Sequence, residues 1–544
     1  MKSKKLWWQK TSIYQIYPRS FSDSNNDGIG DLRGIISRLD YINDLGFETI
    51  WISPFFTSPQ ADWGYDVSDF YNIAPEYGDM GDVIDLISEV HDRGMKIVFD
   101  LVMNHTSDQH AWFLESRSSR DNPKRDWYIW KDGRGNRPPN NWKAIPGGAG
   151  WQYDEKTSQW YYTSFFPFQP DLNYRNPQVK KAMFDVVRYW LERGVDGFRL
   201  DIFRSIYKDA QLRDNPFSFR FAPTEYFTEG WFQKWEFNQN QPETFELAKE
   251  LRSYVDAHST DGFLLGEVYG DYDVMRAYLG EQQDGLNIVF LWDLMKLKPA
   301  ANFLRKVVLN YEMHYPEPFV PVYIFGNHDV KRLISKINNN VELAKLLAIF
   351  QFTVRGVPVI YYGEEIGMQE VNVPARVVKD PLGHRYRWIP AAAVKLLDLY
   401  PNRDGCRTPM HWDGSDNAGF CSKDAVPWLP VHPDYHLINV EEEASVENSL
   451  LNVYKRLLRL RRESGAIREG TIQLVEGSKN ENLLVYYREY EDELILVVIN
   501  FSGSPADYLN QSKCNNVRFE IGMDNINHHE RFTLPPNSGV ILSN

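Results

Sequence analysis

Eight short apolar runs, spread along most of a 544-residue chain, are the feature that most limits its fold. They are 13–17, 49–52, 96–101, 197–201, 263–267, 285–290, 322–326 and 357–361. Amphipathic helical patterns or long polar insertions separate them, and strands that alternate with helices call for a parallel sheet. Eight repeats predict an α/β fold, a closed (β/α)8 TIM barrel. A doubly wound sheet is the alternative, but the first run is not followed by the glycine-rich phosphate turn of that fold.

Two insertions and a change of pattern divide the chain further. Residues 104–176 are rich in Trp, Asn, Pro and Gly, and we expect them to form an inserted subdomain B over the barrel mouth, after the third strand. The barrel then comprises 1–103 and 177–468, with an irregular insertion at 369–422. From 469 to 544 the sequence alternates in short strand-like segments, which predicts a C-terminal antiparallel β-domain.

Composition excludes several classes of partner. A formal net charge of −14 without a strongly basic run argues against binding to nucleic acid or to anionic membranes. The first residues lack the apolar core of a signal peptide, and no window approaches 18 consecutive apolar residues. Cys406, Cys421 and Cys514 form neither a CxxC pair nor an even set, so reduced thiols are expected. We therefore expect a cytoplasmic protein without an obligate protein partner or an organic cofactor.

The fourth run, Gly197-Phe198-Arg199-Leu200-Asp201, ends on a carboxylate. If it is a buried strand, Asp201 lies at its C-terminal end, where barrels and open α/β sheets place their chemistry. Strand periodicity points Arg199 to the same face, so its positive charge can keep Asp201 ionised and nucleophilic at neutral pH. This arrangement fits an enzyme nucleophile. The alternative is a buried ion pair that only ties neighbouring strands together.

Carboxylates stand at corresponding places on three runs, because Asp201 ends the fourth, Glu267 ends the fifth and Asp329 follows the seventh. Acids at the ends of several barrel strands are typical of a catalytic site. Glycoside hydrolysis needs one carboxylate that attacks the sugar or activates water, and a second one that protonates the leaving oxygen. Asp201 suits the first role and Glu267 the second. Retention and inversion both remain compatible with the pattern, since they differ in the separation of the two carboxylates.

Ordered motifs along nearly the whole chain resemble the α-amylase family of glycoside hydrolases (glycoside hydrolase family 13), within it the oligo-1,6-glucosidase and α-glucosidase branch. They are YQIYPRSF (14–21), GYD (64–66), DLVMNH (100–105), QPDLN (169–173), GFRLD (197–201), GEV (266–268), GNHD (326–329) and YYGEEIGM (361–368). The resemblance implies a retaining double displacement. Asp201 would be the nucleophile, Glu267 the general acid/base, and Asp329 the residue that grips sugar hydroxyls in the transition state.

By the same resemblance, a further set of side chains holds the non-reducing glucose of a small α-glucoside. They are Asp66, His105, Gln169, Arg199, His328 and one arginine of the stretch 403–410, either Arg403 or Arg407. Phe165 of the aromatic-rich insertion is a candidate for stacking on a sugar ring.

Oxygen-bearing side chains recur at every second position of 23–31, around glycines, as in a loop that wraps a hard cation. The loop lacks the terminal glutamate of an EF-hand, and an Asx-rich turn that needs no metal is the alternative. The resembled branch carries a structural calcium ion (Ca2+) here. The implied ligands are Asp23, Asn25, Asp27, the Ile29 carbonyl and Asp31.

Position 202 departs from the resembled pattern. In that branch a valine goes with α-1,6 cleavage and a smaller or hydroxylated residue with α-1,4 cleavage, whereas this chain has Ile202, so both linkages stay open. Residues 203–205 and 381–399 also differ, where a second sugar or another leaving group would bind. We predict a retaining, exo-acting α-glucosidase for short α-glucosides, with a covalent glucosyl-Asp201 intermediate.

Two other interpretations are retained. A transglucosylase or sucrose isomerase would form the same intermediate and differ only on the acceptor side. A non-catalytic relative, such as the ectodomain of amino-acid transporter heavy chains, predicts a transmembrane segment and lost carboxylates, whereas Asp201, Glu267 and Asp329 are all present.

Overall fold

The computed structural model describes residues 5–221, 228–374, 376–390, 393–394, 399–475, 482–523 and 530–544. Part of the predicted insertion 369–422, namely 375, 391–392 and 395–398, therefore lies outside the described residues. The chain forms two compact units. Unit 1 comprises Met1–Ile50, Arg93–Met95 and Leu291–Asn544, and unit 2 comprises Trp51–Asp92 and Lys96–Phe290. The domain boundaries predicted from the sequence stay predictions.

Eight strands form one sheet, and each corresponds to one of the predicted apolar runs. They are β1 (Ile13–Ile16), β2 (Thr49–Ile52), β5 (Lys96–Leu101), β9 (Gly197–Leu200), β12 (Phe263–Gly266), β13 (Ile288–Val289), β14 (Val322–Ile324) and β15 (Val357–Tyr361). Their order is β13-β12-β9-β5-β2-β1-β15-β14, and the pairs β1–β15, β14–β15, β5–β9, β9–β12 and β12–β13 are parallel. This confirms the predicted (β/α)8 fold.

Strand β9 lies between β5 and β12 in unit 2, and its first residue shows how tightly they pair. A Cβ atom on Gly197 would lie only 2.2 Å from the carbonyl oxygen of Phe263, so a larger residue does not fit. The register pairs Asp100 of β5 and Leu265 of β12 with Arg199. The strand ends that follow are therefore level with one another.

The longer helices of unit 2 precede its barrel strands. They are α4 (Met80–Asp92), α6 (Pro177–Leu191) and α7 (Pro242–His258). In α6 the side chain of Asn176 caps the N-terminus by accepting a hydrogen bond from the Gln178 amide, and Pro177 occupies the first position, which needs no N–H. Its buried residues recur at helical spacing, so one stripe of the helix packs on the core.

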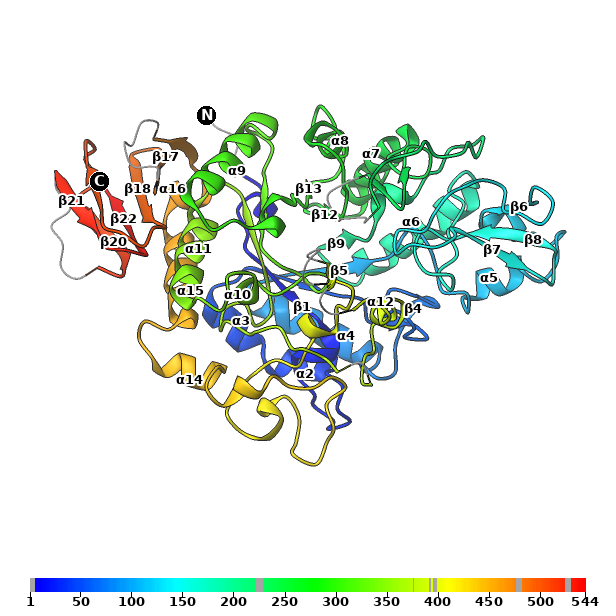
Figure 1. The fold of residues 1–544 in the computed structure, drawn as a ribbon, viewed down its shortest axis with the longest axis horizontal. Coiled ribbons are helices and arrows are strands. Elements are labelled where there is room, and N and C mark those ends of the chain that lie inside the picture. The colour runs from blue at the N-terminus through cyan, green and yellow to red at the C-terminus, as the bar shows by residue number, and fades with distance from the viewer. Residues whose placement is uncertain are drawn as a thin grey trace. The chain divides into compact units, whose positions relative to one another are not determined.

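The predicted insertion after the third barrel strand contains its own small sheet. Strands β6 (Trp130–Lys131), β7 (Trp151–Asp154) and β8 (Gln159–Tyr162) form it in the order β6-β8-β7, all antiparallel, with α5 (Ala111–Ser116) nearby in the chain (Figure 1). Trp142, Trp151 and Tyr162 are almost fully buried together. Trp142 and Trp151 of this insertion are therefore core residues.

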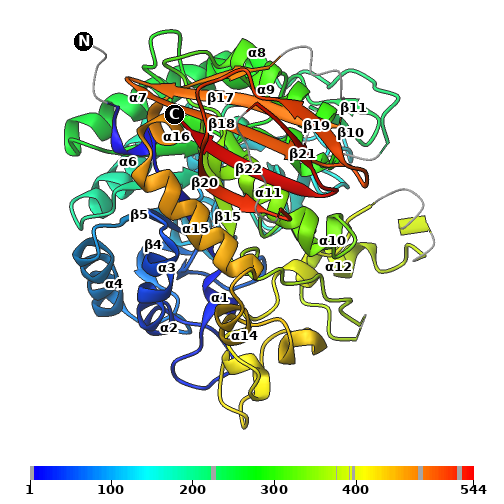
Figure 2. The ribbon, with the colours of Figure 1, turned by 90° about the vertical axis from the view of Figure 1, so that its left-hand side faces the viewer.

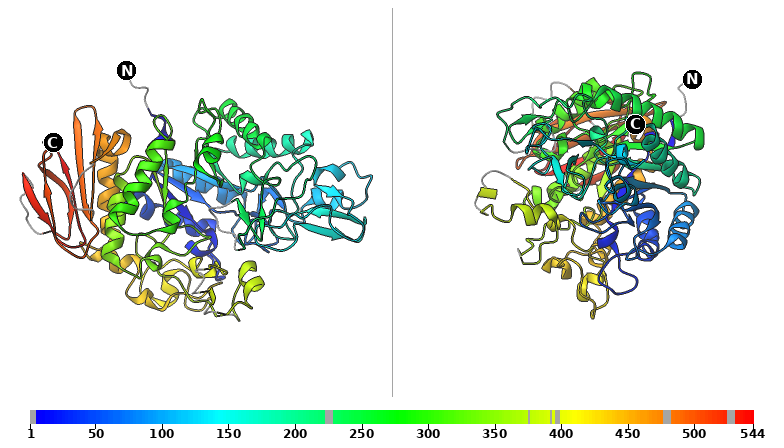
Figure 3. Two further views of the ribbon diagram at one scale, coloured as in Figure 1. Left: turned by 45° about the horizontal axis from the view of Figure 1, so that its top comes forward. Right: turned by 90° about the vertical axis from the view of Figure 1, so that its right-hand side faces the viewer.

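The C-terminal part of unit 1 is an antiparallel β-domain, as predicted. A five-stranded sheet has the order β16 (Thr471–Leu474), β17 (Leu483–Tyr490), β18 (Glu493–Asn500), β22 (Ser538–Ser543), β20 (Asn516–Ile521), and β19 (Ala506–Leu509) pairs with β21 (Arg531–Leu534). It packs on α11 (Val341–Thr353), α15 (Leu450–Glu463) and α16 (Gly465–Glu469) (Figures 2 and 3).

The remaining elements are short or irregular. The other helices are α1 (Pro18–Phe21), α2 (Leu32–Ser37), α3 (Leu39–Leu45), α8 (Tyr272–Ala277), α9 (Ala301–His314), α10 (Leu333–Lys336), α12 (Pro381–Tyr386) and α14 (Val440–Ser445). Short strands are β3 (Phe56–Thr57), β4 (Asp69–Ile73), β10 (Glu229–Gly230) and β11 (Gln233–Lys234), and 3₁₀ turns are η1 (Trp7–Gln9), η2 (Arg125–Trp127), η3 (Phe203–Ser205), η4 (Asp293–Lys296), η5 (Asp404–Cys406), η6 (Asp416–Gly419) and η7 (Pro433–His436). Among the residues described, none of the helices has the length and apolarity needed to cross a bilayer.

Two glutamates that follow β15 are buried in unit 1. Glu364 accepts a hydrogen bond from the hydroxyl of Tyr454 (3.2 Å), and Glu365 accepts from Tyr14 and Tyr41 (both 2.7 Å). Burial raises the pKa of Glu364 to about 8, because a buried carboxylate loses its hydration. At neutral pH this side chain is therefore mainly a neutral acid.

We predict that Glu364→Gln weakens the pH dependence of stability between about pH 4.5 and about pH 8. A carboxyl group whose pKa is raised on folding favours the folded state when protonated, and this contribution is lost as the pH rises from 4.5 through about 8. The complete loss is at most about 5 kcal/mol. Between about pH 6 and about pH 9 the Tm of the natural protein should fall more than that of the variant.

The exposed Glu447 supplies the control, since Glu447→Gln changes the same functional group without burial. Its Tm should follow that of the natural protein at every pH. If Glu364→Gln does the same, the assignment of a buried neutral acid is wrong.

Candidate active site

A buried arginine in unit 2 binds three carboxylates at once. Nη1 of Arg199 donates to Asp100 Oδ1 (2.8 Å) and to Asp201 Oδ1 (2.9 Å), and Nη2 donates to Glu267 Oε2 (2.6 Å). The Arg199 side chain is 1% exposed. Burial alone would lower the pKa of Arg199, but the charges of Asp100 and Glu267 raise it well above its usual range. We call Arg199, Asp100, Asp201 and Glu267 the carboxylate cluster.

The three strand ends bring this cluster together. Asp201 directly follows β9 and its amide donates to the Leu101 carbonyl (3.2 Å), while the Glu267 amide donates to the Leu200 carbonyl (3.0 Å). The strand ladders therefore continue to the two acids and fix their backbones. The structure thus brings together Asp201, Glu267 and Arg199, as the sequence predicted.

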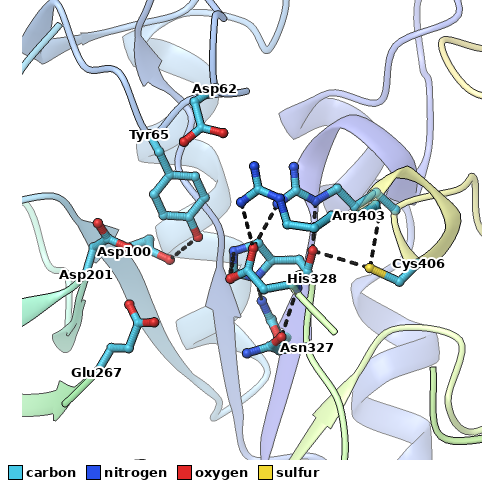
Figure 4. A network of polar contacts seen from close by, with 12 residues as sticks. Asp62, Tyr65, Asp100, Asp201, Glu267, Asn327, His328, Arg403 and Cys406 are labelled. Atoms are coloured by element: carbon cyan, nitrogen blue, oxygen red, sulfur yellow. Dashed lines mark hydrogen bonds and ion pairs between the residues drawn. The ribbon is translucent and has the colours of Figure 1, made fainter. Parts of the chain in front are cut away.

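Asp100 is a cluster member that the sequence analysis did not select as a site residue. Its Oδ2 also accepts hydrogen bonds from Trp51 Nε1 (3.2 Å) and from the Tyr65 hydroxyl (3.0 Å), the latter drawn in Figure 4. Burial raises the pKa of Asp100 to about 6 even though Arg199 opposes the shift. The signal was present, because Asp100 stands one residue before the end of the third strand run, within a motif that carries the family resemblance.

Both oxygens of Glu267 are held. Oε2 accepts from Arg199 and from the amide of Ile202 (2.9 Å), and Oε1 accepts from the Tyr269 hydroxyl (2.9 Å). Ile202 has φ of 33°, a left-handed conformation that is strained for a β-branched residue. This conformation directs its N–H to Glu267. The role of the Ile202 side chain in linkage preference stays a prediction.

Two further predicted residues of unit 2, Asp66 and Gln169, are linked through Asp62. Asp66 accepts hydrogen bonds from Ser58 Oγ and from the amides of Ala61 and Asp62, each at 2.9 Å, and burial raises its pKa to about 6. Gln169 Nε2 donates to Asp62 Oδ2 (3.1 Å), which makes Asp62 a further polar residue that the sequence analysis missed. It stands four residues before Asp66, outside the quoted motif.

The two remaining candidates of unit 2 differ in character. Burial lowers the pKa of His105 to about 4, so its ring is neutral at neutral pH. Nε2 lies 3.0 Å from the Tyr65 carbonyl oxygen, which can only accept, so the ring proton is on Nε2 and is donated to that oxygen. Phe165 is half-buried and packs edge-on against Phe166. Its contact with a sugar stays a prediction.

In unit 1 the predicted residues gather around Asp329. Its Oδ1 accepts from Arg403 Nη1 (3.0 Å) and Arg407 Nη2 (2.9 Å), and its Oδ2 lies 3.1 Å from His328 Nε2. The side-chain nitrogen Nε2 of Gln15 donates to His328 Nδ1 (2.8 Å), so the proton of a neutral His328 is on its Nε2 and faces Asp329. Figure 4 labels His328 and Arg403 of this group, which we call the Asp329 cluster.

The two arginines of the Asp329 cluster differ in their other partners. Arg403 also pairs with the buried Asp380 (Nη2 to Oδ1, 2.8 Å), whereas Arg407 Nε donates to the His328 carbonyl (2.7 Å). Burial alone would raise the pKa of Asp380, yet the Arg403 guanidinium holds it below its usual range. Asp380 therefore orients Arg403, a role that no sequence motif announced.

Side-chain oxygens of the loop 23–31 accept hydrogen bonds from the backbone amides of the same loop. Asp23 accepts from the amides of Asn26 (2.7 Å) and Gly28 (2.8 Å), and Asp27 accepts from the Ile29 amide (2.8 Å). Asp31 caps α2 by accepting from the Gly34 amide. Within the described part of the chain, no three acidic, His or Cys side chains converge closely enough to hold a metal. Asp31 also accepts hydrogen bonds from the amide and the hydroxyl of Ser24. The oxygen donors of the loop are of the type that calcium prefers.

We predict that Asp100→Asn lowers turnover of a 4-nitrophenyl α-glucoside by about 100-fold, because Arg199 loses the anchor that fixes its orientation. Steady-state kinetics measure the loss, and the Tm shows that the variant is folded. Asp256→Asn is the matched control, since Asp256 also accepts two hydrogen bonds from one arginine, Arg252, but on an exposed helix surface. Equal activity of the two variants would contradict the anchoring role.

Comparisons with known proteins agree with this geometry. A family model described as "Alpha amylase, catalytic domain" matches residues 15–470. An oligo-1,6-glucosidase of Parageobacillus thermoglucosidasius is 36% identical over 536 residues, which cover 92% of this chain and 91% of that protein. A probable alpha-glucosidase of Rhizobium meliloti is 39% identical over 515 residues, covering 92% of this chain and 90% of that protein.

Solved structures extend the likeness over the whole fold. The crystal structure of an alpha-glucosyl transfer enzyme superposes with a TM-score of 0.88 at 35% identity, and the match covers 99% of this chain and 100% of that one. The chain therefore belongs to the α-amylase family of glycoside hydrolases.

Proposed function

We propose that this protein is a retaining α-glucosidase that removes glucose from the non-reducing end of short α-glucosides. The observation that carries the proposal is the bridge made by Arg199, which binds one oxygen of Asp201 and one of Glu267 through neighbouring nitrogens. Two carboxylates on one guanidinium lie close together, and a short separation, about 5–5.5 Å, is typical of retaining enzymes.

The roles of the two acids follow from their surroundings. The ionised Asp201 attacks the anomeric carbon, and Glu267 gives its proton to the glycosidic oxygen, which leaves with the aglycone. Water then attacks the glucosyl-Asp201 ester while Glu267 takes up a proton, and glucose leaves with its α configuration. The permanent charge of Arg199 keeps Asp201 ionised during the first step.

Residues that hold hydroxyl groups supply the specificity for glucose in this proposal. In unit 2, Asp66 and Gln169 present an acceptor and donors in fixed orientations. His105 is neutral and so hydrogen-bonds without adding charge. The names of the relatives support α-glucosides such as maltose, isomaltose or sucrose as the substrate class.

A transglucosylase or sucrose isomerase is the second candidate, favoured by the likeness to an alpha-glucosyl transfer enzyme. Such an enzyme forms the same glucosyl-Asp201 ester, which a sugar hydroxyl intercepts instead of water. The ratio of free glucose to new oligosaccharides, after incubation with maltose, isomaltose and sucrose separately, distinguishes the two.

The three cysteines are free and buried, which supports a reducing compartment such as the cytoplasm.

We predict that Asp201→Asn lowers kcat for a 4-nitrophenyl α-glucoside by about 10⁴-fold or more, because an amide is a poor nucleophile. Burst-free steady-state kinetics and a Tm close to that of the natural protein are expected. As a second probe, Asp201→Gly leaves space for added azide, which should restore activity and yield the β-glucosyl azide. In the absence of azide, activity of either variant within tenfold of the natural protein would overturn the assignment of Asp201.

We further propose that loop 23–31 binds a structural calcium ion through Asp23, Asn25, Asp27, the Ile29 carbonyl and Asp31. The oxygen donors support this assignment. Added calcium should raise the Tm of chelator-treated protein, and Asp27→Asn should abolish the increase. A Tm that is unchanged by chelator and by calcium would refute the site, and the loop would then be a turn held by its own amides.

A further inference from the structure

Arg204 is a buried cation just beyond the proposed nucleophile, in a segment where the sequence departs from the family pattern. It is 4% exposed, and its Nε and Nη1 have no hydrogen-bond partner among the described residues. Its guanidinium carbon lies 3.7 Å from the centre of the Tyr269 ring, so the charge stacks on an aromatic face. Tyr269 is itself buried, at 5% exposed. A stacked cation without such partners needs a reason.

A single asparagine holds the two segments together. The amide of Asn240 donates to the Arg204 carbonyl (2.8 Å), and its side-chain nitrogen donates to the Tyr269 carbonyl (3.0 Å). Its side-chain oxygen accepts from the hydroxyl of Tyr278 (2.7 Å). Asn240 therefore fixes the distance between the guanidinium and the ring through their backbones.

The stacked pair of Arg204 and Tyr269 contacts Glu267, the proposed acid/base, through the tyrosine hydroxyl. The Tyr269 hydroxyl donates to Glu267 Oε1 at 2.9 Å, while Oε2 already accepts from Arg199 and from the Ile202 amide. An oxygen that accepts from a permanent cation and from an amide is a poor site for a proton. The transferable proton is therefore carried by Oε1, next to the tyrosine hydroxyl, which can both accept and donate.

We propose that Arg204 is a positioning residue for glycoside cleavage, acting through Tyr269 on Glu267. The inference rests on the proposed function and deepens it. The cation on the ring face holds the ring in place and makes the phenol a better donor. When Oε1 has given its proton to the departing oxygen, the tyrosine hydroxyl donates to the new carboxylate and stabilises it.

Proton balance is kept through both half-reactions. In the first, the proton leaves Oε1 for the glycosidic oxygen as the bond to the anomeric carbon breaks and the bond to Asp201 forms. In the second, water gives a proton to Oε1 while its oxygen displaces Asp201. Tyr269 and Arg204 keep their own protons throughout. They change only the stability of the carboxylate that appears between the steps.

The charges around Arg204 agree with this role. Burial lowers the pKa of Arg204, whereas the neighbouring Tyr269, Glu267, Tyr278 and Asp201 raise it. The positive charge of Arg204 therefore interacts electrostatically with both proposed catalytic acids.

The test compares two substrates that differ in their need for acid catalysis. Departure of 4-nitrophenol needs little proton transfer, whereas departure of glucose from maltose needs it fully. For Arg204→Met, kcat/KM should fall about tenfold more on maltose than on 4-nitrophenyl α-glucoside, mainly through kcat. Arg204→Lys, which keeps the charge, should restore most of the difference.

Tyr269→Phe tests the same route without removing a buried charge, and so serves even if Arg204→Met folds poorly. It should reproduce the selective loss on maltose, and the double variant should lose no more than the worse single variant. Equal losses on both substrates, or additive losses in the double variant, would overturn the proposal. If the natural protein cleaves neither substrate, the proposed function fails instead, which is a distinct result.

Discussion

The ion pairs of Arg199 are the interaction on which the rest of unit 2 depends. A guanidinium that is 1% exposed has lost its hydration, and this loss is compensated only if several acceptors reach it. Strands β5, β9 and β12 must therefore end level with one another, since Asp100, Asp201 and Glu267 reach the same group from three strand ends. The glycine that begins β9 and the strained backbone of Ile202 serve the same requirement.

Each unit contains carboxylates that are paired with arginines. In unit 2 one arginine serves three acids, and in unit 1 two arginines serve Asp329 while Asp380 balances one of them. In each cluster neighbouring guanidinium groups form ion pairs with the carboxylates and so offset their loss of hydration. The neutral acid at Glu364 and the neutral ring of His105 show the converse, because the loss of hydration on burial outweighs the attraction of nearby opposite charges and disfavours the charged form.

The fold and the principal site residues could be predicted because both follow short-range rules. Apolar runs at strand length located all eight barrel strands, and the strand-end rule selected Asp201 and Glu267. The partners that orient them could not be predicted in the same way. Ile202 acts through its N–H and Tyr269 through a hydroxyl beside Glu267. Asp380 lies outside every motif, so only the folded chain shows that it meets Arg403.

The stereochemistry of the first product tests the account most directly, because it depends on the closeness of Asp201 and Glu267. Proton NMR during early hydrolysis of 4-nitrophenyl α-glucoside separates the two anomers of glucose before mutarotation mixes them. The account predicts that α-glucose appears first, followed by slow growth of the β anomer. Initial release of β-glucose would show direct attack by water, and the bridge made by Arg199 would then hold a general base and an acid rather than a nucleophile.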